Sequence, residues 1–216
     1  MKKLNRIDSK GITLIELLVA LVICGVVIAG IYRVFVAQSK AYTVQDQVVE
    51  VQQGIRSAME ILLRDLRMAG YDSDNVNSPI TIANPIGYPV ADNSIKVNYE
   101  HYNTTTLLYE THTVDYSRDA GTSELNRQLT INNVAGPIEP ILENVNALNF
   151  EYGVDTNDDG AMDGSWVSAG GIGAGKVVAV RVVLTAKPDQ TNPDVKNWVS
   201  PRTLTSAVTL RNQYLK

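Results

Sequence analysis

Gly11-Ile12-Thr13-Leu14-Ile15-Glu16 opens a long apolar run near the start of the chain. From Leu17 to Tyr32 no side chain carries a formal charge, and apolar residues continue past Arg33 to Ala37. A helix of about 20 mostly apolar residues spans the ~30 Å hydrocarbon core of a bilayer. The run 12–37 therefore predicts a membrane-spanning helix.

Glu16 is a carboxylate inside this apolar run. An acid within a membrane segment costs roughly 2.5 kcal/mol or more at the helix centre, so it is a functional-site hypothesis. A secretory signal has its small-residue cleavage site after the apolar core, whereas here Gly11 precedes the core. Cleavage after Gly11 would keep the apolar segment and make Ile12 the new N-terminus. The leader before it is basic and contains Lys2, Lys3, Arg6, Asp8 and Lys10.

These residues resemble the class III signal of the type IV pilin superfamily, in which a glycine, a hydrophobic residue and T-L-[IV]-E precede a membrane helix. The family usually has phenylalanine where this chain has Ile12. There are two alternatives. One is an uncleaved single-span anchor, and the other is a secretory signal cut near Ala37 or Ala41. Both alternatives leave Glu16 unexplained.

The resemblance implies that a prepilin peptidase cuts between Gly11 and Ile12 and methylates the new amine. It also implies that Glu16 of one subunit pairs with the Ile12 ammonium of a neighbour. Breaking a buried pair costs about 3–5 kcal/mol, so Glu16 would set the stagger between subunits. The implied partners are other major and minor pilins, contacted through the N-terminal helix, together with an inner-membrane assembly platform and membrane lipid.

The charge pattern indicates topology and excludes one class of partner. A basic leader stays in the cytoplasm, so we expect a single membrane pass with the head outside the cytoplasm. The resemblance implies that this membrane is the bacterial inner membrane and that the protein is later carried to the pilus on the cell surface. The chain has a net charge of -4, and removing the leader leaves -7. Without a basic patch, nucleic-acid binding is not expected. Cys24 is the only cysteine, so no intrachain disulfide can form.

A second helical pattern follows the apolar run without a break. Apolar residues recur at intervals of three and four, which predicts one buried stripe on a helix that continues from about Thr13 to Ala69. Gly70 followed by Tyr71 is a credible helix stop. The members of the stripe are Val44, Val48, Val51, Ile55, Ala58, Met59, Leu62 and Leu66.

The end of this helix reads R-D-L-R-M-A-G-Y over residues 64–71. It resembles the signature that ends the helix in PilW-type minor pilins, and J-type minor pseudopilins of type II secretion have a looser version. The residues that carry the resemblance are Arg64, Asp65, Arg67, Gly70 and Tyr71. We expect the charged residues among them to pair with head loops or neighbouring subunits, with cations favoured at the helix C-terminus.

The remainder of the chain reads as strands separated by turn clusters, one of them at Gly136-Pro137. The predicted strands are 95–102, 107–116, 125–131, 145–154, 177–185 and 203–210. We therefore predict an α+β, pilin-like fold in which the amphipathic half of a long N-terminal helix packs on an antiparallel sheet. The predicted organisation is a leader 1–11, a membrane and assembly helix 12–37, an amphipathic helix half 38–70 and a β-rich head 71–216.

One loop has the composition of a calcium site. Oxygen side chains stand at positions one, three, five and nine of a calcium-type loop, and the carbonyl of the seventh residue would be a further ligand. Trp166 stands where such loops have a bidentate Glu, so a hydrogen-bonded turn is the alternative. The candidate Ca²⁺ ligands are Asp155, Asn157, Asp159, Ala161 and Asp163.

Catalysis is not expected, because the sequence lacks a nucleophile motif, a P-loop or a complete metal set. His101 and His112, the only histidines, fall in different predicted strands and read as surface or packing residues. The resemblance implies a structural subunit, a minor pilin that primes or caps a type IV pilus. The alternatives are a minor pseudopilin at the tip of a type II secretion filament and a membrane-tethered binding module or adhesin.

Overall fold

The computed structural model describes residues 11–72, 82, 84–87, 91–188, 191, 193–197 and 199–210. The predicted leader, apart from Gly11, lies outside this part of the chain. Residues fall into two compact units, Met1–Gln45 and Asp46–Lys216. Helix α1, Leu14–Met68, supplies the described helical residues of the first unit and continues into the second.

The limits of α1 agree with the predicted helix within one residue at each end. No proline precedes Pro79, so nothing in the sequence breaks the helix earlier. Gly70 follows the helix with φ +74°, a left-handed conformation that glycine adopts at little cost and that ends helices. The Gly70 amide donates to the Asn98 carbonyl at 2.9 Å, so the end of the helix lies beside the strand that contains Asn98.

In the first unit, α1 is apolar and uncovered. It is the one helix in the described residues that is long and apolar enough to cross a membrane, with a mean hydropathy of 2.9 in its most apolar window. The large apolar side chains from Ile12 to Phe35 are all at least half exposed in the single chain.

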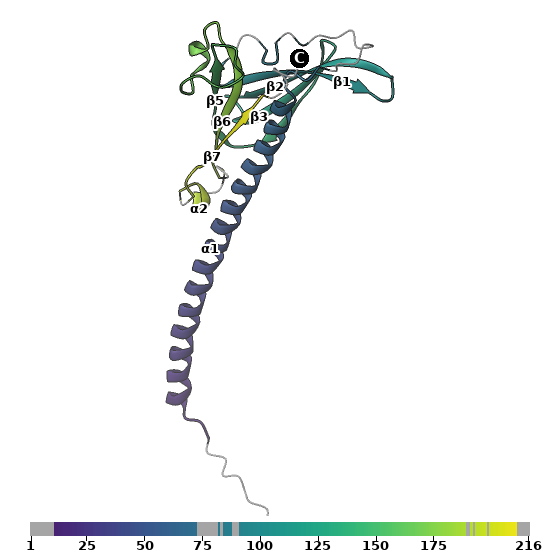
Figure 1. Cartoon of the computed structure of the whole chain (residues 1–216). Helices are drawn as coiled ribbons and strands as arrows, with labels where there is room; N and C mark the ends of the chain where they lie inside the picture. Colours follow the sequence, from purple (N-terminus) through teal and green to yellow (C-terminus); the bar gives the residue numbers. More distant parts are fainter. Residues whose placement is uncertain are drawn as a thin grey trace, which may run out of the picture. The chain divides into compact units, whose positions relative to one another are not determined.

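The second unit contains two antiparallel sheets and the end of α1 (Figure 1). The four-stranded sheet has the order β1-β2-β3-β4, and the three-stranded sheet has the order β5-β6-β7. The strands are β1 Ser94–Asn103, β2 Leu108–Arg118, β3 Leu125–Ile131, β4 Val134–Leu142, β5 Val145–Asp155, β6 Lys176–Ala186 and β7 Arg202–Thr209. Two short helices, η1 Ala169–Gly171 and α2 Pro193–Lys196, lie in the connections before β6 and β7.

The predicted α+β fold class is confirmed, with one strand missed. Gly136-Pro137 was predicted as a turn, but both residues lie inside β4. The turn that precedes β4 is Asn132-Asn133, where both residues have positive φ as in a tight hairpin turn. β4 tolerates its prolines, Pro137 and Pro140, because it is an edge strand that pairs only with β3.

The core lies between α1 and the two sheets. The predicted helical stripe is buried from Val51 to Leu66, whereas Val44 and Val48 are half-buried. The largest fully buried side chains on the strands are aromatic: Tyr116 on β2, with Phe150 and Tyr152 on β5. This packing holds the end of α1 against β2 and β3, where the candidate site at the helix end is found.

Candidate functional site

The first turn of α1 is closed by a reciprocal pair between Thr13 and Glu16. The Glu16 carboxylate accepts hydrogen bonds from the Thr13 amide at 3.0 Å and the Thr13 hydroxyl at 2.9 Å. The Glu16 amide donates back to the Thr13 hydroxyl at 3.3 Å. This T-x-x-E arrangement is a capping box, which satisfies amides that would otherwise be unpaired at a helix start. The role of Thr13 was not predicted, although the spacing in the sequence contains the signal.

The capping box also positions the carboxylate. It holds the Glu16 carboxylate against Thr13, the residue that follows Ile12, while the side chains around it remain apolar and exposed. Soluble proteins rarely expose so much contiguous apolar surface, which indicates that lipid or other helices cover this part of α1. The predicted assembly residues Ile12 and Glu16 therefore lie together at the end of an uncovered apolar helix.

The signature at the end of α1 contains a buried carboxylate, Asp65. Its Oδ2 accepts a 2.6 Å hydrogen bond from the Tyr116 hydroxyl on β2 and a 3.0 Å contact from Nε of Arg127 on β3. Burial and the hydrogen bond to Asp65 raise the pKa of Tyr116 well above its ordinary value. Burial opposes the charge on Arg127, but the pairing with Asp65 outweighs it and raises the pKa of this guanidinium.

Of the other members of the signature, the two arginines face solvent and Tyr71 contacts β1. Arg64 is mostly exposed and approaches Asp65 Oδ1 to 3.4 Å, and Arg67 is exposed. The carbonyl of Tyr71 accepts the Glu100 amide of β1 at 2.8 Å. Head loops or neighbouring subunits were the predicted partners of the charged residues, but Asp65 pairs with side chains on strands. The reason is that β2 and β3 cross directly over the last turns of α1.

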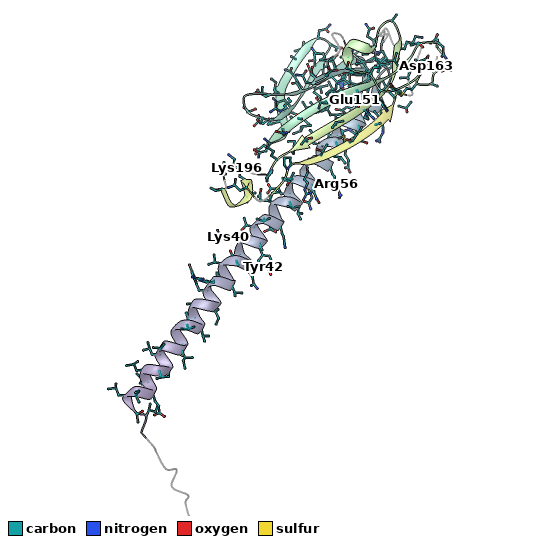
Figure 2. The ribbon with its side chains drawn as sticks, turned by 90° about the vertical axis from the view of Figure 1, so that its left-hand side faces the viewer. Lys40, Tyr42, Arg56, Glu151, Asp163 and Lys196 are labelled. Atoms are coloured by element: carbon teal, nitrogen blue, oxygen red, sulfur yellow. The ribbon has the colours of Figure 1, made fainter. Side chains whose placement is uncertain are left out.

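The candidate calcium loop, at the edge of the second unit where Figure 2 labels Asp163, is internally hydrogen-bonded. Asp155 accepts the amides of Asn157, Asp158 and Gly160 at 2.7–3.0 Å. Asp163 Oδ2 accepts the amide and the hydroxyl of Thr156. These are the bonds of the alternative interpretation, a hydrogen-bonded turn.

The fit of this loop to a cation is partial. The side-chain amide of Asn157 donates to both Asp159 and Asp163, which brings these three side chains together. The amide nitrogen of Asn157, which cannot bind a cation, therefore lies among the carboxylate oxygens. Trp166 contacts Arg181 instead of supplying a ligand. Within the described residues, no three His, Cys, Asp or Glu side chains are placed so that they could hold a metal ion. Calcium binding here stays a prediction.

The two histidines come together on β1 and β2. His112 is buried and His101 is exposed, with ring centroids 4.6 Å apart. Glu110 lies 3.5 Å from Nε2 of His112. Burial, and secondarily the neighbouring His101, lower the pKa of His112. Neither histidine lines the groove between α1 and the β4–β5 connection.

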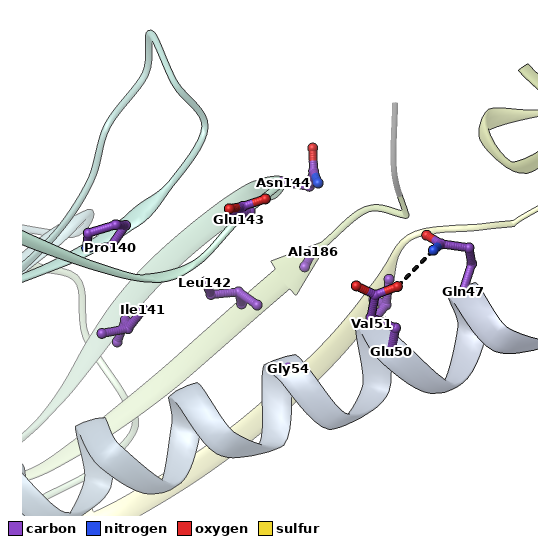
Figure 3. A pocket seen from close by; sticks show the side chains of 10 residues that line it. All are labelled: Gln47, Glu50, Val51, Gly54, Pro140, Ile141, Leu142, Glu143, Asn144 and Ala186. Atoms are coloured by element: carbon purple, nitrogen blue, oxygen red, sulfur yellow. Dashed lines mark hydrogen bonds between the residues drawn. The ribbon is translucent and has the colours of Figure 1, made fainter. Parts of the chain in front are cut away.

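A groove lies between α1 and the connection from β4 to β5 (Figure 3). Its floor includes Gly54, where a Cβ atom would come within 3.0 Å of Leu142. Its rim is acidic and polar, with Glu143 on one side and Glu50, bonded to Gln47 at 2.7 Å, on the other.

Two family models match the sequence. The prokaryotic N-terminal methylation motif matches residues 6–32, and type IV pilus-assembly protein W, PilW, matches residues 111–214. Together the two matches support a type IV minor pilin of the PilW type. No curated protein and no solved structure matches it significantly.

The two matches cover different parts of the chain. The methylation motif contains Gly11, Ile12 and Glu16, and the PilW match covers the strands from β2 onward. The residues on which the resemblance was based lie between Gly11 and Tyr71, so the family signal in the head, at residues 111–214, was missed. The matches indicate a structural pilus component rather than an enzyme.

Proposed function

We propose that this minor pilin primes or caps a type IV pilus after its leader is removed between Gly11 and Ile12 and Ile12 is N-methylated. The observation that carries the proposal is the uncovered apolar start of α1, with Glu16 held at its first turn by Thr13. An apolar helix of this kind can reside in the membrane before assembly and pack against other helices in the filament.

In the filament, the Glu16 carboxylate pairs with the methylated ammonium of Ile12 in a neighbouring subunit. The capping box already holds the carboxylate at the start of the helix. Such a pair adds little net stability, but an unpaired partner in an apolar environment is strongly disfavoured. The pair therefore selects one stagger between subunits. Prepilin peptidase, other pilins and an inner-membrane platform are the proposed partners, with the head outside the cytoplasm.

A Glu16→Ala chain produced from the native locus tests the proposal. Glu60→Ala is the matched control, since Glu60 is an exposed acid on the same helix. We expect both variants to enter the membrane and to begin at N-methylated Ile12, as read by mass spectrometry of the N-terminal peptide. Only Glu16→Ala should be missing from pili sheared from the cell surface.

Two results would overturn the proposal. Normal amounts of Glu16→Ala in sheared pili would remove the register role of Glu16. A native chain that still begins with its leader would remove the processing step. Each alternative function predicts a different result. A type II secretion pseudopilin should be recovered with the secretion filament instead of the pilus. An adhesin should bind its ligand in the absence of any filament.

A further inference from the structure

A single cation interrupts the uncovered apolar part of α1. Arg33 is exposed, and no Asp or Glu occurs between residues 17 and 45. The residues one turn before and one turn after it on the helix are Ala29, Gly30, Val36 and Ala37. None of these side chains can neutralise a guanidinium. A negatively charged partner for Arg33 therefore has to come from outside this part of the helix.

The composition of α1 changes at the same point. No Phe, Trp or Tyr precedes Tyr32 in the sequence, whereas Tyr32 and Phe35 stand on either side of Arg33 and are 65% and 66% exposed. Lys40 and Tyr42, labelled in Figure 2, repeat the combination of a cation and a phenol further along the helix. Tyrosines gather where a spanning helix meets the headgroup layer, and long cationic side chains extend toward that layer. This change indicates that the hydrocarbon core ends near residues 32–33.

The spacing of the two charges on this segment fits the same limit. Helix α1 is continuous from Leu14 to Met68, so Glu16 and Arg33 lie on one helix. At ~1.5 Å per residue they are about 25 Å apart along its axis, roughly 5 Å less than the ~30 Å hydrocarbon core. Both charges reach the headgroups only if their side chains extend outward. Glu16 already does so, because its carboxylate bonds to Thr13 at the start of the helix, and the long Arg33 side chain can do so at the other end.

We propose that Arg33 anchors the outer end of the membrane segment by binding the phosphate group of a phospholipid in the outer leaflet. The inference rests on the proposed function for one stage only, the residence of the helix in the membrane before assembly. Phosphate suits this side chain, because a guanidinium can donate two parallel, charge-assisted hydrogen bonds to it. The anchor gives α1 one depth in the bilayer, with Glu16 at the inner headgroup layer.

A second copy of this chain does not supply the partner. The proposed pair between Glu16 and Ile12 of a neighbour offsets two helices by about four residues, or ~6 Å. Arg33 then faces residues near 29–37 of the other copy, which contain no acid. The nearest acids in the sequence, Glu16 and Asp46, would require an offset of about 20–25 Å.

The depth of Cys24 in a bilayer tests the anchor. Cys24 is the only cysteine, so a nitroxide attached to it reports the depth of α1 in the full-length protein. The samples are nanodiscs of phosphatidylethanolamine and phosphatidylglycerol that hold a single chain. We expect Arg33→Leu to move the label about 3–4 Å away from the midplane, because the apolar run then extends to Ala37 and the helix shifts to bury it. Arg33→Lys should keep the wild-type depth, because lysine also reaches the headgroups. Arg56→Leu is the control, since Arg56 is exposed on the same helix beyond the apolar run.

Solid-state NMR of protein with isotope-labelled arginine reads the phosphate contact, as dephasing of guanidinium carbon by lipid phosphorus. We expect part of this signal to disappear in Arg33→Lys and all of it to persist in Arg56→Lys. A signal unchanged in Arg33→Lys, or an unmoved label in Arg33→Leu, overturns the proposal. A depth difference that arises only when several chains share a nanodisc assigns the partner to another subunit and also overturns it. If wild type itself does not span the bilayer, the proposed function fails; if it spans but the Arg33 variants behave like wild type, only the anchor fails.

Discussion

The Tyr116 hydroxyl on β2 donates a 2.6 Å hydrogen bond to Asp65 near the end of α1, although 51 residues separate the two in the sequence. Arg127 of β3 donates to the same carboxylate oxygen at 3.0 Å. This triad is a largely buried polar connection between α1 and the four-stranded sheet, and it makes an acidic helix residue a specific docking point for that sheet.

The triad predicts a graded loss of stability. Tyr116→Phe removes one buried hydrogen bond and should lower the free energy of unfolding by about 1–2 kcal/mol. Asp65→Ala removes the buried carboxylate from the part-buried Arg127, which keeps only a 3.8 Å ion pair with the exposed Glu139 and its contact with Tyr116, and should cost about 3 kcal/mol. Arg64→Ala is the control, because this side chain is 67% exposed and its ion pair should contribute less than about 1 kcal/mol. Denaturant unfolding of the full-length protein in micelles measures all three, and equal values for Tyr116→Phe and wild type would contradict the argument.

The buried His112 predicts acid sensitivity of the head. Its pKa is lowered from 6.5 by burial and by His101, so the unfolded chain binds a proton more readily than the folded chain. The stabilisation is therefore complete above about pH 6.5 and is lost as the pH falls toward the lowered pKa. We expect the unfolding temperature to drop between about pH 7.5 and 5.5, and His112→Phe to flatten this drop because it keeps an aromatic ring without the titration. An unchanged slope in His112→Phe would assign the acid sensitivity to other groups.

We propose weak calcium binding at residues 155–163. An incomplete oxygen site has a dissociation constant of ~1 mM, so 10 mM Ca²⁺ should add about 1.4 kcal/mol to the free energy of unfolding. The rise should be absent with Mg²⁺ and in the double variant Asp155→Asn plus Asp159→Asn. Calorimetric titration and thermal unfolding of the full-length protein measure it. If Ca²⁺ and Mg²⁺ have equal effects, the loop is a hydrogen-bonded turn and nothing more.

The sequence by itself determined the parts of this protein that depend on local order. The helix limits, the apolar run with Glu16 at its start, the buried stripe from Val51 to Leu66 and the α+β class follow from composition and from periodicity over neighbouring residues. The helix and most of the strands were predictable because a period of 3.6 or 2 residues is visible without knowing what packs against it.

Only the tertiary structure decided which distant residues meet. Strand β4 was missed because its prolines read as a turn, and its edge position, which makes them acceptable, is a property of the sheet. The partners of Asp65 lie 51 and 62 residues away, and no local pattern specifies such a pairing. The positive φ and the exposure of Leu107 likewise depend on the position of the β1–β2 turn, which lies beyond the last residue that pairs with β3. These features depend on the packing of complete sheets against α1, a global property that a window of sequence does not contain.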